Sequence, residues 1–289
     1  MRPPGDPSNT ACGNGRHEVS ILLAMAPFYE QAQVYNAYNA QVHYAGNDPA
    51  SSSNITLSGV GISTLWCPSD PAISGATYDL YYWDLSDGRK FNMRYTSYKG
   101  NAGIYPAPGR YDCPYYPDSS CPFSQMQGQA NGVFNYYSKT SIGSITDGTS
   151  NTLLFGEAAW GRLGAGRDSE QQEWQWWTSG NYGDSLFLSM FPSNPQKRVG
   201  DDGGIRGINT SIYVLATSSL HPGGCNFAMC DGSVRFIKDT ISIAPFDPST
   251  GIPLGLTFTN CTYTMANQWG TYQQLSTRNG GVVISADSY

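Results

Sequence analysis

The sequence predicts an α+β fold in which a helix near the amino end packs on a mainly antiparallel β-sheet. Apolar residues recur at helical spacing between Glu18 and Tyr38, and such an amphipathic pattern needs an apolar surface to cover. From Ile62 onward, short β-branched or aromatic runs alternate with Gly, Pro, Asn and Asp, which is typical of strands joined by turns. Consecutive strands joined by short turns pair most directly in an antiparallel arrangement.

The predicted helix has two segments that meet at Pro27. The first runs from Glu18 to Ala26 and the second from Phe28 to Tyr38. Pro27 suits the first turn of the second segment, where no backbone N–H is needed.

The expected strands follow in chain order: Ser63 to Trp66, Tyr78 to Trp83, Ser97 to Gly100, Gly132 to Tyr137, Thr152 to Glu157, Glu173 to Trp177, Tyr213 to Ser218, and a hairpin after position 224. No polar linker or internal repeat divides the chain, so we expect a single domain over residues 1–289. Residues 158–209 are Gly-rich and charged, and we interpret them as a loop-rich insertion over the sheet.

The hairpin is the clearest local signal. Asp231-Gly232 follows one strand-like run and precedes another, which predicts a two-residue turn with positive φ. His221 stands just before the outgoing strand. His221 and Asp231 could form a metal site or a general-base pair, but turn chemistry already explains the Asp-Gly step. We therefore favour structural roles for His221, Asp231 and Gly232.

The nine-residue gap between His221 and Asp231-Gly232 resembles the His-x9-Asp-Gly signature of a large family of prepilin-like bacterial proteins, grouped under domain of unknown function 1559. Other segments resemble the landmarks of that family, in the same order: Tyr29 to Gln31, Tyr35 to Asn39, Trp66 to Pro71, Tyr98 to Gly103, Ile145 to Glu157, and Leu275 to Gly281.

The resemblance implies the globular head of a type IV pilin-like or type II pseudopilin-like component. Such a protein has a structural or assembly role, with other pilin-like subunits or copies of itself in a filament as partners. It is extracytoplasmic, at the cell surface, in the periplasm or secreted, and it is not an enzyme. Fold and location follow from this analogy more directly than activity does.

The amino end departs from the family pattern, in which a long apolar helix follows a short basic leader. This chain begins Met1-Arg2-Pro3-Pro4-Gly5, which resembles the segment just after that helix. The longest apolar run, from Ile21 to Phe28, is shorter than the roughly 20 residues that cross a bilayer. We expect a soluble ectodomain whose membrane contact and assembly depend on the absent helix.

Composition excludes some partner classes. The chain has a net charge of -6 and its Lys and Arg residues are scattered, whereas nucleic acids and anionic lipids need a clustered basic surface. Abundant Gly, Pro and Tyr with only 13% charged residues indicate a turn-rich domain with many amphipathic aromatic side chains. We expect no nucleic-acid partner.

The seven cysteines lack the C-x2-C spacing of zinc knuckles, which favours disulfides in an oxidising compartment. Cys113 and Cys121 bracket a short Pro-rich loop, and we predict that they are joined. Cys225 and Cys230 lie on opposite faces of one strand and cannot reach each other.

Two further sets of residues each have a functional and a structural interpretation. Asp147, Asn151 and Glu157 could offer oxygen ligands to Ca²⁺, although this ion needs six to eight oxygens. An Asx-turn leading into the next strand is the favoured interpretation. No cofactor is otherwise expected.

The aromatic set could line a sugar-binding face, and its members are Trp174, Trp176 and Trp177. Buried packing or a subunit contact is the favoured use. A soluble extracytoplasmic module that binds carbohydrate or another ligand is therefore the alternative function. The motifs of a nucleophile elbow, a P-loop, a dinucleotide site and a zincin are all absent from the sequence.

Overall fold

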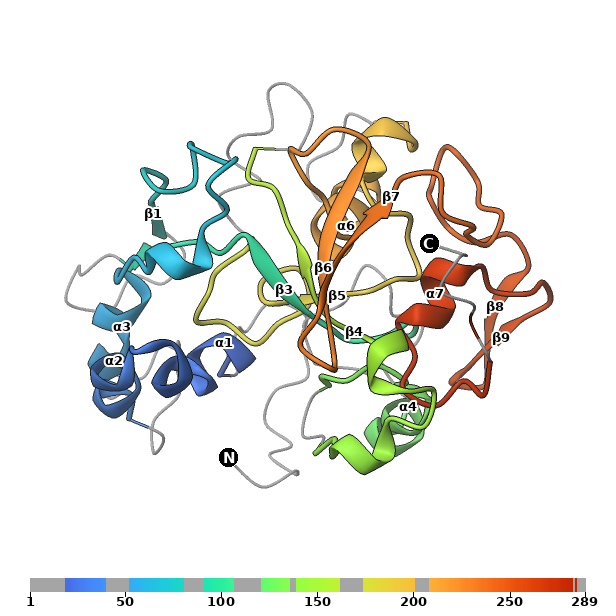
Figure 1. Cartoon of the computed structure of the whole chain (residues 1–289), viewed down its shortest axis with the longest axis horizontal. Helices are drawn as coiled ribbons and strands as arrows, with labels where there is room; N and C mark the ends of the chain where they lie inside the picture. Colours follow the sequence, from blue (N-terminus) through green and yellow to red (C-terminus); the bar gives the residue numbers. More distant parts are fainter. Residues whose placement is uncertain are drawn as a thin grey trace.

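The computed structural model describes residues 19–39, 52–80, 91–106, 121–135, 139–161, 174–200, 208–282 and 284. A five-stranded sheet of order β5-β3-β4-β6-β7 lies at its centre (Figure 1). Its strands are β3 (Tyr98–Asn101), β4 (Leu153–Glu157), β5 (Leu186–Phe187), β6 (Gly224–Met229) and β7 (Val234–Lys238).

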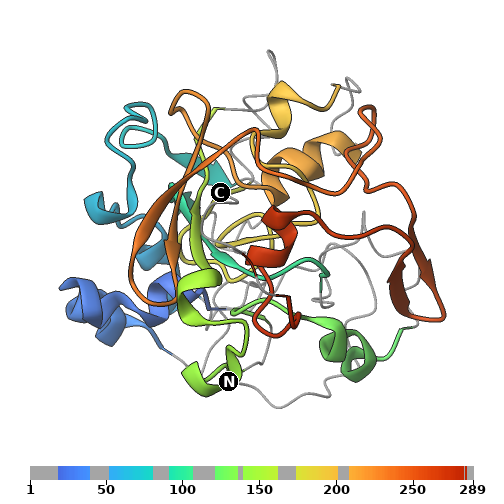
Figure 2. The same cartoon turned by 45° about the vertical axis from the view of Figure 1, so that its right-hand side comes forward.

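The central sheet is mainly antiparallel, as predicted. β3 pairs with β4, β4 with β6, and β6 with β7 in antiparallel register, while β5 adds to β3 in parallel. Two smaller antiparallel sheets pair β1 (Tyr78–Leu80) with β2 (Phe91–Met93) and β8 (Leu256–Thr259) with β9 (Thr262–Met265). The β8–β9 hairpin stands apart from the central sheet in both ribbon views (Figures 1 and 2).

The helices are short. The α-helices are α1 (Ile21–Ala24), α2 (Ala32–Ala37), α3 (Ser52–Ser58), α4 (Phe123–Gln129), α6 (Ile208–Leu215) and α7 (Thr271–Leu275). The 3-10 helices are η1 (Ala26–Tyr29), η3 (Ser63–Leu65), η6 (Ile142–Ser144), η7 (Thr149–Asn151) and η8 (Pro195–Lys197). In the part of the chain that the structure describes, no helix has both the length and the apolar character needed to cross a membrane.

The prediction of one long helix in two segments is wrong for the described residues 19–39. Three short pieces replace it, because Pro27 lies in the first turn of η1 and Glu30 then adopts a left-handed conformation with φ of 65°. Only α1 is well anchored. The Ser20 hydroxyl accepts a hydrogen bond from Leu23 N and donates one to Trp177 O, which caps the helix and ties it to a distant segment. α2 has no buried residue.

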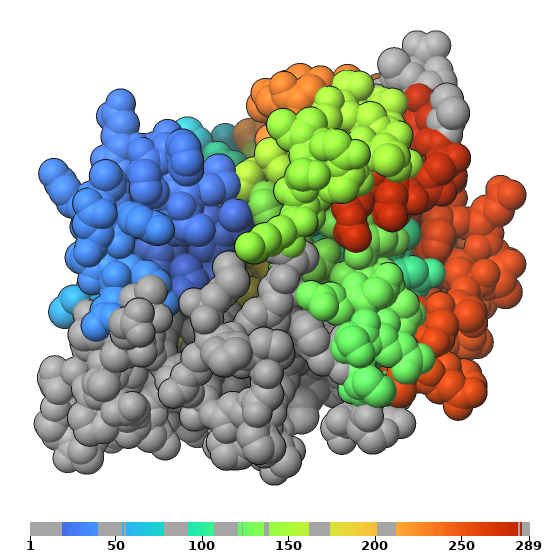
Figure 3. All heavy atoms as spheres, turned by 90° about the horizontal axis from the view of Figure 1, so that it is seen from below, coloured from blue at the N-terminus to red at the C-terminus, as the bar shows by residue number. Residues whose placement is uncertain are grey.

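Residues 174–200 correct the prediction of an insertion over residues 158–209. Instead of covering the sheet, they supply its edge strand β5 and several core side chains, including the fully buried Phe187 and Phe191. The other described residues lie around this core. Seen from below, α1 and α2 are on one side of the molecule and the segment around β8 and β9 is on the opposite side (Figure 3).

Candidate functional site

The Asp-Gly turn has the structural role that we predicted. Asp231 Oδ1 accepts hydrogen bonds from the backbone N and the hydroxyl of Ser233, at 2.9 and 2.7 Å, and these bonds lower the pKa of Asp231. Met229 N donates to Ser233 O across the turn. The loop therefore has three residues where two were predicted, and within it only Gly232 has a positive φ, of 86°, as in a type I turn with a G1 bulge.

His221 and Asp231 do not form a pair. The six-residue strand β6 lies between them, and at about 3.3 Å per residue it separates the two side chains by roughly 20 Å. The ring of His221 instead turns to the central sheet, where its Nε2 lies 3.2 Å from Oε1 of Glu157. The hypothesis of a His221–Asp231 site is therefore wrong, and the ring of His221 contacts the central sheet instead.

The three residues of the possible calcium site also lie apart. The Asp147 carboxylate accepts hydrogen bonds from Thr277 Oγ1, Gly280 N and Gly281 N, so it pins the carboxyl-terminal loop. Asn151 ends η7 before β4, and Glu157 lies at the far end of β4. The predicted convergence on one ion does not occur, because an entire strand separates the acidic groups.

The tryptophans do not share an exposed face. Trp176 and Trp177 are buried and pack in two different clusters, and the partly buried Trp174 packs against a third. The segment is not a regular strand, because Gln175 has a φ of 67°. This observation removes the support for an aromatic sugar-binding surface and agrees with the favoured prediction of buried packing.

A different set of side chains converges at the end of β4. Cys67 follows η3, Glu157 is the last residue of β4, and His221 lies in the loop before β6. The Cys67 Sγ atom lies 3.8 Å from His221 Nε2 and 4.0 Å from Glu157 Oε1. These three residues are called the Cys67 cluster below, and their ligand atoms all lie within 4.8 Å of one another.

The sheet places Glu157 at the base of this cluster. Tyr98 of β3 is its register partner, and Asn226 of β6 lies on the other side. Gly156 allows the close packing of β4, because a Cβ there would come within 2.7 Å of side-chain carbons of Phe227 and Thr217. Glu157 is consequently held on a rigid strand in the middle of the sheet.

Hydrogen bonds hold the Glu157 carboxylate in place. Asn226 N donates to Oε2 at 2.7 Å, and Asn226 Nδ2 donates to Oε1 at 3.1 Å. Cys67 is fixed through its backbone, because Cys67 N donates to Ser97 Oγ at 2.9 Å. The acid and the thiol are therefore positioned by neutral groups of the adjoining strands and loop.

The Cys67 cluster contains a buried carboxylate with little compensating positive charge among the described residues. Glu157 is only 5% exposed, and among the described residues its one cationic partner is the titratable His221. Burial raises the pKa of Tyr98 to about 12, and negative charge on Cys67 and Glu157 adds to this increase. A buried carboxylate beside a thiol favours a positive charge between them.

The arrangement differs from a catalytic relay. In a Cys-His-acid triad, one ring nitrogen contacts the nucleophile and the other contacts the acid. Here the same atom, Nε2 of His221, lies near both Cys67 Sγ and Glu157 Oε1. The three donor atoms therefore lie close to one another, as the ligands of one metal ion do.

A model of the family described as "Protein of unknown function (DUF1559)" matches residues 2–243. The chain belongs to this family. No curated protein and no solved structure gives a significant match. The predicted membership of the family of domain of unknown function 1559 is thus confirmed. All three residues of the Cys67 cluster lie inside the matched range, while Cys261 lies beyond it.

Sequence reasoning placed Cys67, Glu157 and His221 in three separate motifs and did not bring them together. Cys67 and His221 are 154 positions apart, and Cys67 and Glu157 are 90 apart. The available signal was that each of them lies in a segment that resembles a family landmark. The sequence alone suggests a calcium ligand at Glu157 and a hairpin role for His221, and it assigns no role to Cys67.

The disulfide prediction is corrected as well. Cys121 is joined to Cys261, with a Cα–Cα distance of 5.4 Å, so the predicted Cys113–Cys121 bridge is wrong. Cys113 itself lies outside the described residues. Cys225 and Cys230 are both free, in agreement with the prediction that they do not pair with each other.

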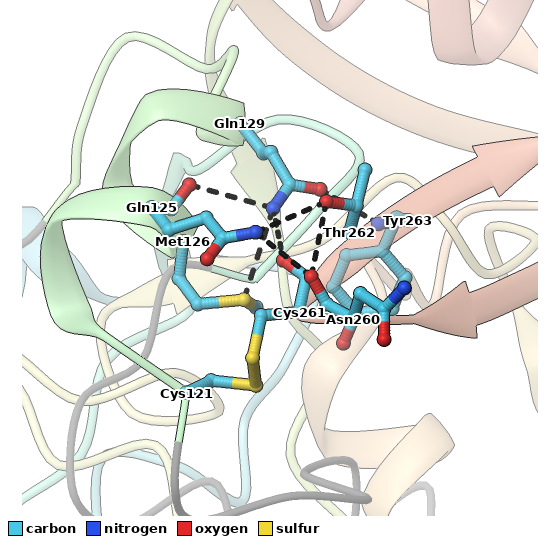
Figure 4. Close-up of a disulfide and its surroundings, with 8 residues drawn as sticks. All are labelled: Cys121, Gln125, Met126, Gln129, Asn260, Cys261, Thr262 and Tyr263. Atoms are coloured by element: carbon cyan, nitrogen blue, oxygen red, sulfur yellow. Dashed lines mark hydrogen bonds between the residues drawn. A yellow bond between two sulfur atoms is a disulfide. The ribbon is translucent and has the colours of Figure 1, made fainter.

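The bridge joins the start of α4 to the β8–β9 turn (Figure 4). Gln125 Nε2 donates to Asn260 O at 2.8 Å, and Gln129 Nε2 donates to Cys261 O at 2.6 Å. Gln129 Oε1 also accepts a hydrogen bond from Tyr263 N. The disulfide therefore reinforces a hydrogen-bonded contact between two segments that are far apart in sequence.

Proposed function

We propose that this chain is the globular part of a pilin-like or pseudopilin-like component that acts by assembly with other such subunits outside the cytoplasm. The observation that carries the proposal is the free edge of the central sheet. In the described part of the chain, β7 has a strand neighbour on one side only, β6.

Two large apolar side chains stand on the exposed face of this edge strand. Val234 is 70% exposed and Phe236 is 44% exposed, and they share one face because side chains alternate along a strand. Ile237, on the other face, is buried. An edge strand with exposed apolar side chains is a surface on which another chain can add.

Two other features support this role. The Cys121–Cys261 disulfide is typical of proteins that fold in an oxidising compartment. The motif residues Asp147 and Asp231 spend their carboxylates on loop and turn hydrogen bonds, which is architecture and not chemistry. Trp176 and Trp177 are buried and Trp174 packs against the core. In the described part of the chain, no observation therefore favours the carbohydrate-binding alternative.

The experiment compares the chain alone with a form in which a pilin-type apolar helix is fused ahead of residue 1. The chain alone should sediment as a monomer, and the fused form should enter membranes and assemble. The edge variant Val234→Thr/Phe236→Lys should then assemble less, while Ile142→Lys, a change at another highly exposed apolar residue, should have no effect.

Two results would contradict separate parts of the proposal. Ordered polymers formed by the chain alone would show that assembly does not depend on the apolar helix. Normal assembly of the edge variant, with an unchanged circular dichroism spectrum, would show that β7 is not a subunit contact.

A further inference from the structure

We propose that Cys67, Glu157 and His221 bind one zinc ion, with a fourth coordination position open to solvent. The proposal rests on the convergence of a thiol sulfur, an imidazole nitrogen and a carboxylate oxygen on one point. Zinc is the divalent ion whose protein ligands are of these three kinds. Calcium and magnesium prefer oxygen ligands alone.

The spacing of the donor atoms fits tetrahedral zinc. Zinc bonds of about 2.0 to 2.3 Å at tetrahedral angles place neighbouring donor atoms about 3.3 to 3.6 Å apart. The observed separations are 3.2 Å for His221 Nε2 to Glu157 Oε1, 3.8 Å for Nε2 to Cys67 Sγ, and 4.0 Å for Sγ to Oε1. Shifts of a few tenths of an ångström in the donor atoms would bring these separations to the values expected for tetrahedral zinc.

The surroundings supply what a metal site needs beyond its ligands. Asn226 donates two hydrogen bonds to the Glu157 carboxylate, which orients the acid as outer-shell groups of metal sites do. Within the described chain, no Lys or Arg forms an ion pair with Glu157. A dication would neutralise the buried carboxylate and the Cys67 thiolate together.

The fourth position faces outward. The His221 side chain is 29% exposed and Cys67 is half-buried, so solvent reaches the cluster. A water molecule is the expected fourth ligand. The ion would tie the loop after η3 and the loop before β6 to the central sheet, and would thereby stabilise a junction between distant parts of the chain.

The test uses the full chain with its disulfide intact, freed of metal by chelation and then dialysed against zinc. We expect one zinc per chain by elemental analysis. Replacement by cobalt should give the ultraviolet band of a thiolate–cobalt bond. Zinc at about 100 times its dissociation constant should raise the melting temperature by about 5 °C.

Variants assign the ligands. Cys67→Ser should abolish the cobalt–thiolate band, whereas Cys230→Ser, at another half-buried free cysteine, should leave it unchanged. Asn226→Ala should weaken zinc binding about 10- to 100-fold, the usual effect of removing an outer-shell partner. Each variant is compared with the wild type in chelator, where equal melting temperatures show that the fold is intact.

A measurement on the wild type alone covers the case in which a variant does not fold. Zinc should slow the alkylation of Cys67 and leave the alkylation rate of Cys230 unchanged, as read by peptide mass mapping. Absence of stoichiometric zinc, a cobalt band that survives Cys67→Ser, or a peptide map in which Cys67 is oxidised to a disulfide would each overturn the proposal.

Discussion

Asn101 is a fully buried polar side chain of β3 whose removal should destabilise the central sheet. Its amide nitrogen donates to Leu153 O at 2.7 Å and to Ser276 O at 2.8 Å, and its Oδ1 accepts from Gly103 N at 2.8 Å. One side chain therefore connects β3 to β4 and to the end of α7. Asn101 has no exposed surface, so water cannot replace these partners.

The substitution Asn101→Leu keeps the side-chain volume and removes all three hydrogen bonds. Gly103 N and Ser276 O lose their partner, whereas Leu153 O keeps a weak hydrogen bond from Cys230 Sγ at 3.8 Å. Each buried group left without a partner costs about 1 to 3 kcal/mol, so the two groups give a loss of at least about 2 kcal/mol. That loss is a large share of the roughly 5 to 15 kcal/mol by which domains are stable. We therefore expect a variant that folds but unfolds at much lower denaturant concentration.

Urea unfolding of the oxidised protein measures this loss. The matched control is Asn267→Leu, because Asn267 is exposed and its amide donates a single hydrogen bond, to Leu254 O. The control should change the free energy of unfolding by about 0.5 kcal/mol or less. A loss below about 1 kcal/mol for Asn101→Leu, with an unchanged denaturant slope, would refute the reasoning from buried partners.

Two further predictions concern distant links. The Cys121–Cys261 bridge closes a loop with a sequence separation of 140. Its removal should therefore destabilise the domain by about 5 kcal/mol in the chain-entropy model. A peptide map of the unreduced protein that joins Cys121 to another cysteine would contradict the pairing. Lys99 and Asp184 are both buried and interact electrostatically, so Lys99→Met should cost about 3 to 5 kcal/mol, and Lys99→Met/Asp184→Asn should recover most of it. Burial raises the pKa of Asp184 from 3.8 to about 7, so the folded state of Lys99→Met binds a proton more readily than the unfolded chain. The charge of Lys99 lowers this pKa, so in the variant the pKa of Asp184 lies higher still, and stability should fall as the pH rises from about 4 to above 7. A pH-independent unfolding midpoint would contradict the assignment.

Local signals predicted local structure well where no distant partner was needed. A hairpin formed at the Asp-Gly step as expected, although its loop has three residues instead of two, because Asp231, Gly232 and Ser233 satisfy the turn locally. The strand expected from Thr152 to Glu157 is β4 with a start one residue later. The prediction of a strand from Tyr213 to Ser218 is wrong, because α6 extends to Leu215 and packs there against the core.

Composition was a weaker guide. The Gly-rich, charged character of residues 158–209 predicted an insertion, yet residues 174–200 contain the edge strand β5 and much of the core. Polar residues such as Ser179 and Asp184 are buried there, where Ser179 Oγ donates to the Asp184 carboxylate. A buried segment can thus look like a loop when its polar groups are paired inside the protein.

By itself, the sequence determined the family, the mainly antiparallel β character and the chemistry of the hairpin turn, because these depend on neighbouring residues and on motif order. Tertiary structure alone decided the partner of Cys121, the parallel addition of β5 and the meeting of Cys67 with Glu157 and His221. These contacts join positions about 85 to 154 residues apart. No periodicity or spacing along the chain encodes which distant groups meet, since that depends on how the strands order themselves around a shared core.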